Sequence, residues 1–242
     1  MSLVALVPCR GGSKRIPGKN TKLLGGKPLV YWTLDAAFQS GIFDRVVLCP
    51  DVACTLPDLS AYYGLEAIVR PESRDDEPDI QWVRYVLSQP TLDTYDAFAI
   101  LRPTSPFRTA DTIRRAWALF QTVPTHALRA MEPVTQHPDK MWLLLENRTC
   151  ATPVTRDDEG YARRHWRDGP LKGVPYHSSP TQTLKPYYVQ NASLEIAPTV
   201  LVLNEHQIAG DFVTPFFTEG WEGFDINTLE DWDRAEAHVA AL

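Results

Sequence analysis

The residues best suited to chemistry lie between positions 10 and 27, where six basic side chains occur without a single acidic one. These residues are Arg10, Lys14, Arg15, Lys19, Lys22 and Lys27. The whole chain carries a net charge of −6, and outside this segment 18 basic residues face 30 acidic ones. Like charges this close repel each other unless an anion relieves the repulsion. The segment therefore predicts a site for a small anionic ligand rather than a solvated basic loop.

Two glycines, Gly11 and Gly12, follow the apolar run 3–7 and suggest how such an anion is held. Glycines at this point are expected to adopt positive φ, so that successive backbone N–H groups form an anion-binding concavity. Arg10 adds a forked donor for phosphate oxygens, and Lys14 and Lys19 add point charges. The segment matches neither GxxxxGK[ST] nor GxGxxG, which argues against a P-loop ATPase or a dinucleotide-binding fold.

The elements that must position this loop alternate between strand and helix through about residue 132. Strands are predicted over 3–7, 45–50, 65–70, 96–101 and 126–133, and helices over 28–41, 79–89 and 109–121. Thr109 or Asp111 is the expected N-cap of the third helix. This alternation predicts an α/β fold of three layers, with a mostly parallel sheet, helices on both faces and right-handed crossovers.

The alternation breaks over residues 133–185, which are rich in Pro, His, Trp and basic residues. We expect this insertion to be an arm that packs on a second subunit, with Trp142, Tyr161 and Trp166 in the dimer core. Strand and helix character returns over 190–202, and Thr228 with Asp231 predicts a capping pair for a final helix. Residues 1–132 and 186–242 are thus expected to form one domain, interrupted by 133–185.

Composition and motifs exclude several functions. The acidic balance argues against nucleic-acid binding. No apolar run reaches the ~18 residues of a membrane span, and the N-terminal segment does not read as a signal peptide. Four cysteines and six histidines lack metal-ligand spacing, there is no GxSxG elbow, and the unpaired cysteines fit the cytoplasm.

Four blocks of the chain carry a resemblance to one family. Residues 10–20 fit R-x-x-S-K-x-x-P-x-K-N, and 101–113, "LRPTSPFRTADTI", resemble L-Q-P-T-S-P-x-R-T. Residues 189–196, "VQNASLEI", resemble N-G-A-x-Y-I, and 224–236, "FDINTLEDWDRAE", resemble D-I-D-T-x-x-D. In this order the blocks are similar to those of the acylneuraminate (CMP-sialic acid) cytidylyltransferases and their pseudaminate and legionaminate relatives. The resemblance implies a nucleotide-diphospho-sugar transferase-like, Rossmann-like fold with an inserted dimerisation arm, and a homodimer.

The resemblance also implies a reaction. Relatives transfer CMP from CTP to the anomeric hydroxyl of an acidic nine-carbon keto sugar, and pyrophosphate leaves. By matching positions, the nucleotide is expected on Arg10, Gly11, Gly12, Ser13, Lys14, Lys19, Asn20 and Arg70, with Arg10, Lys14 and Asp225 as the catalytic residues. Asp225 and Asn227 are the expected ligands of Mg²⁺, the asparagine through an amide oxygen that brings no charge. Asn227 stands where relatives supply a second carboxylate, and strand alternation points both side chains to the same side.

The expected sugar-binding residues are Arg102, Lys140, Gln182 and Asn191, and several positions here depart from the family pattern. Arg102 replaces a glutamine, and we expect it to pair with the sugar carboxylate, to contact an altered substituent, or to bind guanine. Ala192 replaces a glycine, and Thr181 replaces an arginine. These departures keep open a GTP-using or octulosonate-using enzyme, or an inactive nucleotide-sugar binding homologue. The motifs "SKRIPGKN" and "EDWDRAE" favour the pseudaminate branch.

Overall fold

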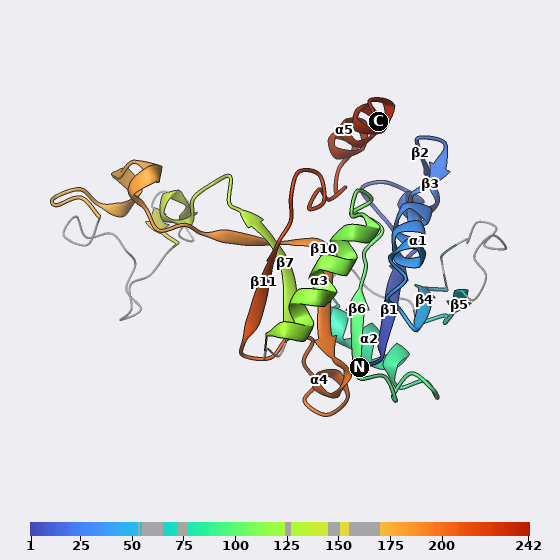
Figure 1. The fold of residues 1–242 in the computed structure, drawn as a ribbon. Helices are drawn as coiled ribbons and strands as arrows, with labels where there is room; N and C mark the ends of the chain where they lie inside the picture. The colour runs from blue at the N-terminus through green and yellow to red at the C-terminus, as the bar shows by residue number, and fades with distance from the viewer. Residues whose placement is uncertain (53, 55–64, 72–76, 124–126, 145–150, 155–169) are drawn as a thin grey trace. The chain divides into compact units, whose positions relative to one another are not determined.

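The computed structural model describes the chain except residues 53, 55–64, 72–76, 124–126, 145–150 and 155–169 (Figure 1). It divides into two compact units, which are described separately. The first comprises Met1–Met131 and Gln190–Leu242, and the second comprises Glu132–Val189. No helix in the described residues is both long enough and apolar enough to cross a membrane.

The first unit is built on a seven-stranded sheet with the strand order β11-β7-β10-β6-β1-β4-β5. The strands are β1 (Leu3–Cys9), β4 (Arg45–Pro50), β5 (Leu65–Ala67), β6 (Ala97–Ile100), β7 (Ala127–Pro133), β10 (Tyr188–Pro198) and β11 (Val213–Phe217). β1 pairs in parallel with both β4 and β6, β4 with β5, and β7 with β11. β10 runs antiparallel to β6. The prediction of a mostly parallel sheet is confirmed.

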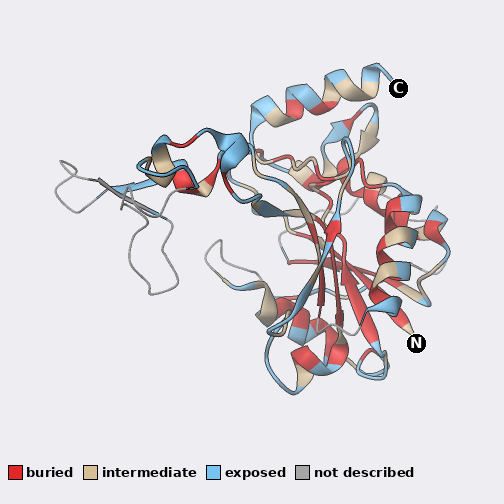
Figure 2. Ribbon diagram, turned by 60° about the vertical axis from the view of Figure 1, so that its left-hand side comes forward, coloured by how far each residue is buried: buried red, intermediate tan, exposed pale blue. Residues whose placement is uncertain are grey.

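Side chains of β1 alternate between two hydrophobic cores, one on each face of the sheet. Leu3, Ala5 and Val7 pack with α1 (Leu29–Ser40) and α3 (Ala110–Thr122). Val4 and Leu6 pack with α2 (Asp79–Leu87) and α4 (Thr199–Leu203). A strand covered on both faces must be apolar at every position, which explains the continuous hydrophobic run that begins the chain. Figure 2 shows buried residues along both the strands and the inner faces of the helices.

A third core lies beneath the basic loop. Ile16 is 1% exposed and packs with Leu24, Phe107 and Ile226, and with Trp232 of α5 (Leu229–Ala240). Two short strands, β2 (Leu23–Leu24) and β3 (Lys27–Pro28), follow. The buried isoleucine anchors a loop that is otherwise polar, because removing it from water is worth roughly 2 kcal/mol.

Helix signals in the sequence were accurate. Thr109 caps α3, with its hydroxyl accepting from the Thr112 amide, so Asp111 is not the cap. Thr228 and Asp231 form a capping box on α5, and Gly41 ends α1 at φ 67°. The clearest differences from the prediction within the seven-stranded sheet concern β5 and β11. β5 ends at Ala67 rather than at residue 70, and β11 was not predicted, because its segment contains a proline that only an edge strand tolerates.

The second unit contains one two-stranded antiparallel sheet, β8 (Trp142–Leu144) with β9 (Ala151–Pro153), among its described residues. Three 3₁₀ turns accompany it: η2 (Pro138–Lys140), η3 (Tyr176–Ser178) and η4 (Thr181–Thr183). His137 is buried, and its Nε2 lies 2.9 Å from the carbonyl oxygen of Lys185. Trp142 is exposed, and Tyr161 and Trp166 lie outside the described residues. The dimerisation role of this unit stays a prediction.

Candidate active site

A cavity of about 330 Å³ lies at the carboxyl ends of the central strands of the first unit. Here the chain order reverses, with β4 and β5 on one side of β1 and β6 on the other. Ligands of open α/β sheets bind at such a switch point. The charged residues that line the cavity are Arg10, Arg15, Lys19, Arg70, Arg102, Glu77, Asp79 and Asp225.

The basic loop is folded by its own backbone and by two side chains. The Gly11 amide donates to Asp51 Oδ1 at 2.9 Å, and the Ser13 amide donates to the Gly11 carbonyl at 3.0 Å. Asn20 is buried and its Nδ2 donates to the Arg10 carbonyl at 3.0 Å. The expectation of positive φ at Gly11 and Gly12 was wrong. The loop instead turns at Gly18, with φ 60°, because the chain enters η1 (Lys19–Thr21) there.

Spacing alone did not separate the loop cations that face the cavity from those that do not. Arg10, Ser13, Lys19 and Asn20 line it. Arg15, which was not among the predicted site residues, also lines it. By contrast, Lys14 is exposed and, with Gly11 and Gly12, lies outside the lining residues.

Lys19 joins the basic loop to the segment before α5. Its Nζ donates to the Ile226 carbonyl at 2.7 Å, and the Ile226 amide donates to the Thr104 carbonyl at 2.8 Å. Burial lowers the pKa of Lys19, while the neighbouring Asp225 acts to raise it. The loop and Asp225 thus lie on the same side of the sheet, as a single site for a metal and a phosphate requires.

Asp225 has one carboxylate oxygen suited to a cation. Its Oδ2 accepts from Asn227 Nδ2 at 2.5 Å, whereas its Oδ1 is buried without a hydrogen-bond partner in the described structure. A buried carboxylate oxygen without a hydrogen-bond partner, beside the basic residues of the cavity, fits Mg²⁺, which takes one or two carboxylates and completes its shell with water and phosphate. Asn227 presents its nitrogen to Asp225, so it ligates a cation only if its amide turns over.

Arg70 is not a surface residue. It is 3% exposed, its Nε donates to the Cys49 carbonyl at 3.1 Å, and its guanidinium lies 5.3 Å from the ring centre of Trp82. Burial lowers its pKa, while Asp51 acts to raise it. Arg70 and Trp82 both line the cavity, so they form a cationic and aromatic wall at the β4–β5 side.

The expected sugar-binding residues are placed in different surroundings. Arg102 lines the cavity and is ion-paired with Asp79 and Glu195. Lys140 lies in the second unit, where its Nζ donates to the Ser179 carbonyl at 2.8 Å. Gln182 lies in the exposed η4 turn of the same unit. Their contacts with a sugar stay predictions.

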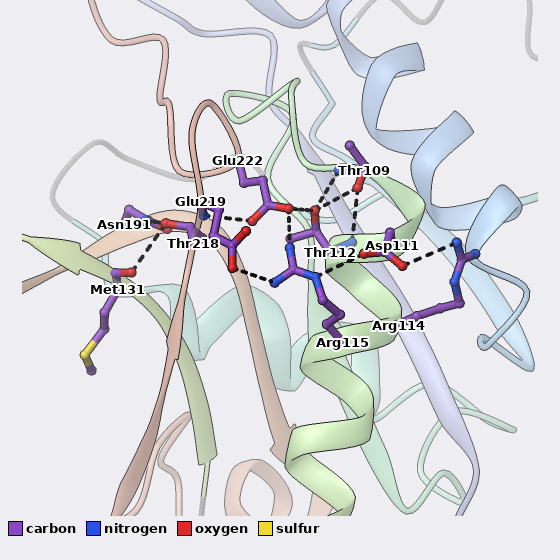
Figure 3. A network of polar contacts seen from close by, with 10 residues as sticks. All are labelled: Thr109, Asp111, Thr112, Arg114, Arg115, Met131, Asn191, Thr218, Glu219 and Glu222. Carbon is purple, nitrogen blue, oxygen red and sulfur yellow. Dashed lines mark hydrogen bonds and ion pairs between the residues drawn. The ribbon is translucent and has the colours of Figure 1, made fainter.

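Asn191 belongs to a polar network outside the cavity lining (Figure 3). Its Nδ2 donates to Thr218 Oγ1 at 2.9 Å, and its Oδ1 accepts from the Ser193 amide at 3.2 Å. In the same network Glu222 accepts from Thr112 Oγ1 at 2.6 Å and pairs with Arg115. These contacts hold the loop that precedes Asp225 against α3.

Sequence reasoning did not place Asp51, Asp79 or Glu195 among the site residues. Asp51 acts to raise the pKa of Arg70, and Asp79 and Glu195 pair with Arg102. Asp51 follows β4 directly, so a carboxylate at a strand end was a usable signal for it. Glu195 lies in the middle of β10 at 3% exposure, and a single acidic residue in an apolar strand was the corresponding signal for an internal ion pair.

A family model described as "Cytidylyltransferase" matches residues 4–115, the segment that supplies the basic loop, Arg70, Asp79 and Arg102. The amino-terminal part of the chain is thus similar to the cytidylyltransferases. Over 243 residues it is 27% identical to the CMP-N,N'-diacetyllegionaminic acid synthase of Legionella pneumophila, covering 98% of this chain and 95% of that one. The family resemblance of the sequence motifs is thereby confirmed.

Other relatives match the amino-terminal half. The N-acylneuraminate cytidylyltransferase of Escherichia coli is 36% identical over 123 residues, which are 50% of this chain and 29% of that enzyme. The pseudaminic acid cytidylyltransferase of Campylobacter jejuni is 34% identical over 126 residues, or 50% of this chain and 53% of that one. The chain thus spans about a third to a half of these relatives, but nearly all of the Legionella enzyme.

Solved structures support the fold. A CMP:2-keto-3-deoxy-manno-octonic acid synthetase complexed with CTP superposes with a TM-score of 0.65 at 14% identity, covering 100% of this chain and 99% of that one. A 4-diphosphocytidyl-2C-methyl-D-erythritol synthase from Anaerococcus prevotii gives 0.63 at 14% identity, covering 99% and 98%. The nucleotidyltransferase-like fold predicted from the sequence is confirmed.

A pair of thiols beside the basic loop gives a testable chemical property. Cys9, the last residue of β1, places its sulfur 3.0 Å from that of the partly exposed Cys54. The hydrogen bond from Cys9 lowers the pKa of Cys54, and the same contact, with burial, raises that of Cys9. Because the thiolate is the reactive form, iodoacetamide should label Cys54 ahead of Cys9 and Cys49 near neutral pH.

The variant Cys9→Ala removes the donor, so the pKa of Cys54 rises and its labelling slows by several-fold near pH 7. Peptide mass spectrometry over a pH series measures the rate at each cysteine. Unchanged labelling of Cys54 in the variant contradicts the assigned hydrogen bond.

Proposed function

We propose that this chain transfers CMP from CTP to the anomeric hydroxyl of a nonulosonic acid and releases pyrophosphate. The single observation that carries the proposal is one cavity in which the family's basic loop and Asp225 meet. The named relatives, which include legionaminic, N-acylneuraminic and pseudaminic acid enzymes, support this class of acceptor. We place the reaction in the cytoplasm, where nucleoside triphosphates are made.

In the proposed reaction the anomeric oxygen forms a bond to the α-phosphorus, and the bond between that phosphorus and the β-phosphate oxygen breaks. The hydroxyl proton passes to solvent, and pyrophosphate leaves. Catalysis of this kind depends on alignment and on cations placed where charge develops. Since Lys14 is exposed outside the lining residues, the proposal gives the first contacts with the phosphates to Arg10 and Lys19.

A magnesium ion fits beside Asp225, whose buried Oδ1 lacks a partner in the described structure. Asp225 would hold the ion, which would supply positive charge to offset that of the phosphates. Lys19 lies close enough to Asp225 for the carboxylate to act to raise its pKa, so its charge would offset that of Asp225 before nucleotide arrives.

The second unit, Glu132–Val189, is proposed to serve the acceptor and a homodimer contact. Lys140 and Gln182 lie in this unit and remain candidates for the acceptor site. We retain two alternatives, a GTP-using or octulosonate-using transferase and an inactive nucleotide-sugar binding homologue. The CTP-bound octonic acid synthetase of similar fold is the reason to include an octulosonate among the acceptors tested.

The test combines each of the four ribonucleoside triphosphates with legionaminic, pseudaminic, N-acetylneuraminic and octulosonic acids. Pyrophosphate release and mass spectrometry of the product give the donor and the acceptor together. CTP with a nine-carbon acid should give a CMP-sugar, and GTP should give none. Absence of pyrophosphate with every pair, despite CTP binding, overturns transfer in favour of the inactive homologue.

A substitution at Asn227 tests the proposed metal site without an activity assay. In Asn227→Asp a second carboxylate replaces the amide that donates to Asp225. Without metal the two carboxylates repel, and the melting temperature should fall by roughly 2–4 °C. Adding MgCl₂ should raise it by more than in the unaltered chain. Asn227→Ala is the control, since it removes the hydrogen bond without adding charge; equal magnesium responses in the two variants contradict the site.

A further inference from the structure

Arg102 connects two elements through two carboxylates. It follows β6, and its Nη2 lies 2.5 Å from Oδ2 of Asp79, the first residue of α2. Its Nη1 lies 2.9 Å from Oε1 of Glu195 in β10. A planar guanidinium is suited to such a bridge, because its donors have fixed directions.

The charges in this cluster are balanced. Glu195 has a side chain that is 4% exposed, and it also pairs with Arg129, so two arginines face two carboxylates. Burial acts to lower the pKa of Arg102, but Glu195 and Asp79 outweigh it and raise the pKa. The Arg102 side chain is 23% exposed, and a partly buried charge that is already paired with two carboxylates has less to gain from a further anion.

From Asp79 the contacts continue toward the nucleotide side of the cavity. Asp79 Oδ1 accepts from Trp82 Nε1 at 2.7 Å, and the Arg70 guanidinium lies 5.3 Å from the Trp82 ring centre. Asp79, Trp82 and Arg70 all line the cavity. Arg102 therefore begins a series of contacts that passes through Asp79 and Trp82 to Arg70.

Both members of the Arg102–Glu195 pair depart from the motifs that the chain resembles. Arg102 stands where L-Q-P-T-S-P has glutamine, and Glu195 stands where N-G-A-x-Y-I has tyrosine. The two departures lie 93 positions apart in the sequence and meet in one ion pair. In this chain each of the two charges is therefore balanced by the other.

We propose that Arg102 is a positioning residue that holds the Asp79–Trp82–Arg70 wall for the nucleotide, and that it is not the ligand of the acceptor's carboxylate. The inference rests on the proposed function, because it assigns this wall to the nucleoside triphosphate CTP. It separates Arg102 from the acceptor contacts expected of it from the motif alone.

Arg102→Gln is the informative variant, because Glu195 keeps its partner Arg129 and Asp79 is 44% exposed to water. Loss of the bridge should raise the dissociation constant of CTP, measured by calorimetry with MgCl₂, by about tenfold. The KM of the acceptor at saturating CTP should stay within about twofold. The opposite result, a raised acceptor KM with unchanged CTP affinity, assigns Arg102 to the acceptor and overturns the inference.

Asp79→Asn breaks the same bridge from its other end and keeps the acceptor oxygen for Trp82. It should weaken CTP binding to a similar extent, and the double variant should be no weaker than either single one, because both act through one link. Additive losses overturn the inference. Arg84→Gln, the same change at an exposed position of α2 outside the cavity lining, is the matched control and should bind CTP normally.

Hydrogen exchange supplies a readout that needs no ligand. Amides in the first turn of α2 should exchange faster in Arg102→Gln and in Asp79→Asn than in the Arg84→Gln control. An unaltered chain that binds no CTP overturns both the proposed function and this inference. An unaltered chain that binds CTP, with Arg102→Gln equal to it in affinity and exchange, overturns the inference alone.

Discussion

Lys19→Met should reduce kcat/KM for CTP by roughly 10²–10³-fold, the range seen when one preorganised charged or polar contact to a transition state is removed. Methionine keeps most of the aliphatic length, so the packing of η1 is preserved while the charge is lost. The variant loses both the cation that faces the cavity and the Nζ donor to the Ile226 carbonyl. Steady-state kinetics with a saturating acceptor measure the effect.

The matched control for this prediction is Lys22→Met. Lys22 belongs to the same basic segment but is exposed and lies over the Trp232 ring at 4.1 Å, outside the cavity lining. If the segment acts only through its summed charge, the two substitutions should have similar effects. We expect the control to stay within about threefold of the unaltered chain, because a screened surface charge has a small effect.

Burial also predicts a pH dependence for this lysine. Its pKa lies below the ordinary lysine value of 10.5, so its positive charge is lost at a lower pH than that of an exposed lysine. As the pH rises, CTP affinity should therefore begin to fall at a lower pH than the one at which an exposed lysine loses its charge. In Lys19→Arg, which keeps its charge throughout this range, that decline should disappear.

Arg108→Met should have the largest effect on stability, a loss of about 3 kcal/mol in the free energy of unfolding. Arg108 is 2% exposed, and its guanidinium donates to the Ser193 carbonyl, to Thr33 Oγ1 at 2.9 Å and to the Arg102 carbonyl at 3.4 Å. Methionine fills part of the space but leaves these buried acceptors without a donor. Such orphaned groups cost about 1–3 kcal/mol each, offset by relief from a buried charge.

Thermal and urea denaturation measure this loss, which corresponds to a fall in melting temperature of roughly 6–12 °C. Arg114→Met is the control, because Arg114 is an exposed arginine of α3 that donates to the Gln39 carbonyl. It should change stability by less than about 0.5 kcal/mol. If Arg108→Met is as stable as this control, the buried guanidinium does not hold α1, β10 and the Arg102 loop together.

Much of the fold was readable because the local and global signals agree. The apolar run of β1 predicts a strand buried on both faces, and the Thr109 and Thr228 signals place two helix starts within one residue. β11 was missed because Pro215 opposes strand formation, and only its edge position makes it acceptable.

The sequence predicted which segments contribute to the site, but not which of their side chains face the cavity. The basic segment was identified from residue types and Asp225 from the family resemblance, but spacing alone does not say which loop lysine points inward. That choice depends on Ile16, whose burial fixes the loop and leaves Lys14 exposed and Lys19 turned toward Ile226. Likewise, Arg102 was read as a free cation, because its partner Glu195 lies 93 residues away and pairing at that separation leaves no local pattern.

The tie between the Arg10–Lys27 segment and the region from Asp225 through α5 has a consequence for synthesis of the protein. Ile16, Leu24 and Trp232 share one core, and Lys19 reaches the Ile226 carbonyl. A ribosome can therefore translate the central strands and release them to fold while the early segment still lacks the late residues it packs against. The chain should bind nucleotide only after residues 225–240 leave the exit tunnel. Stalled chains that end before α5 should therefore fold in part but fail to retain CTP.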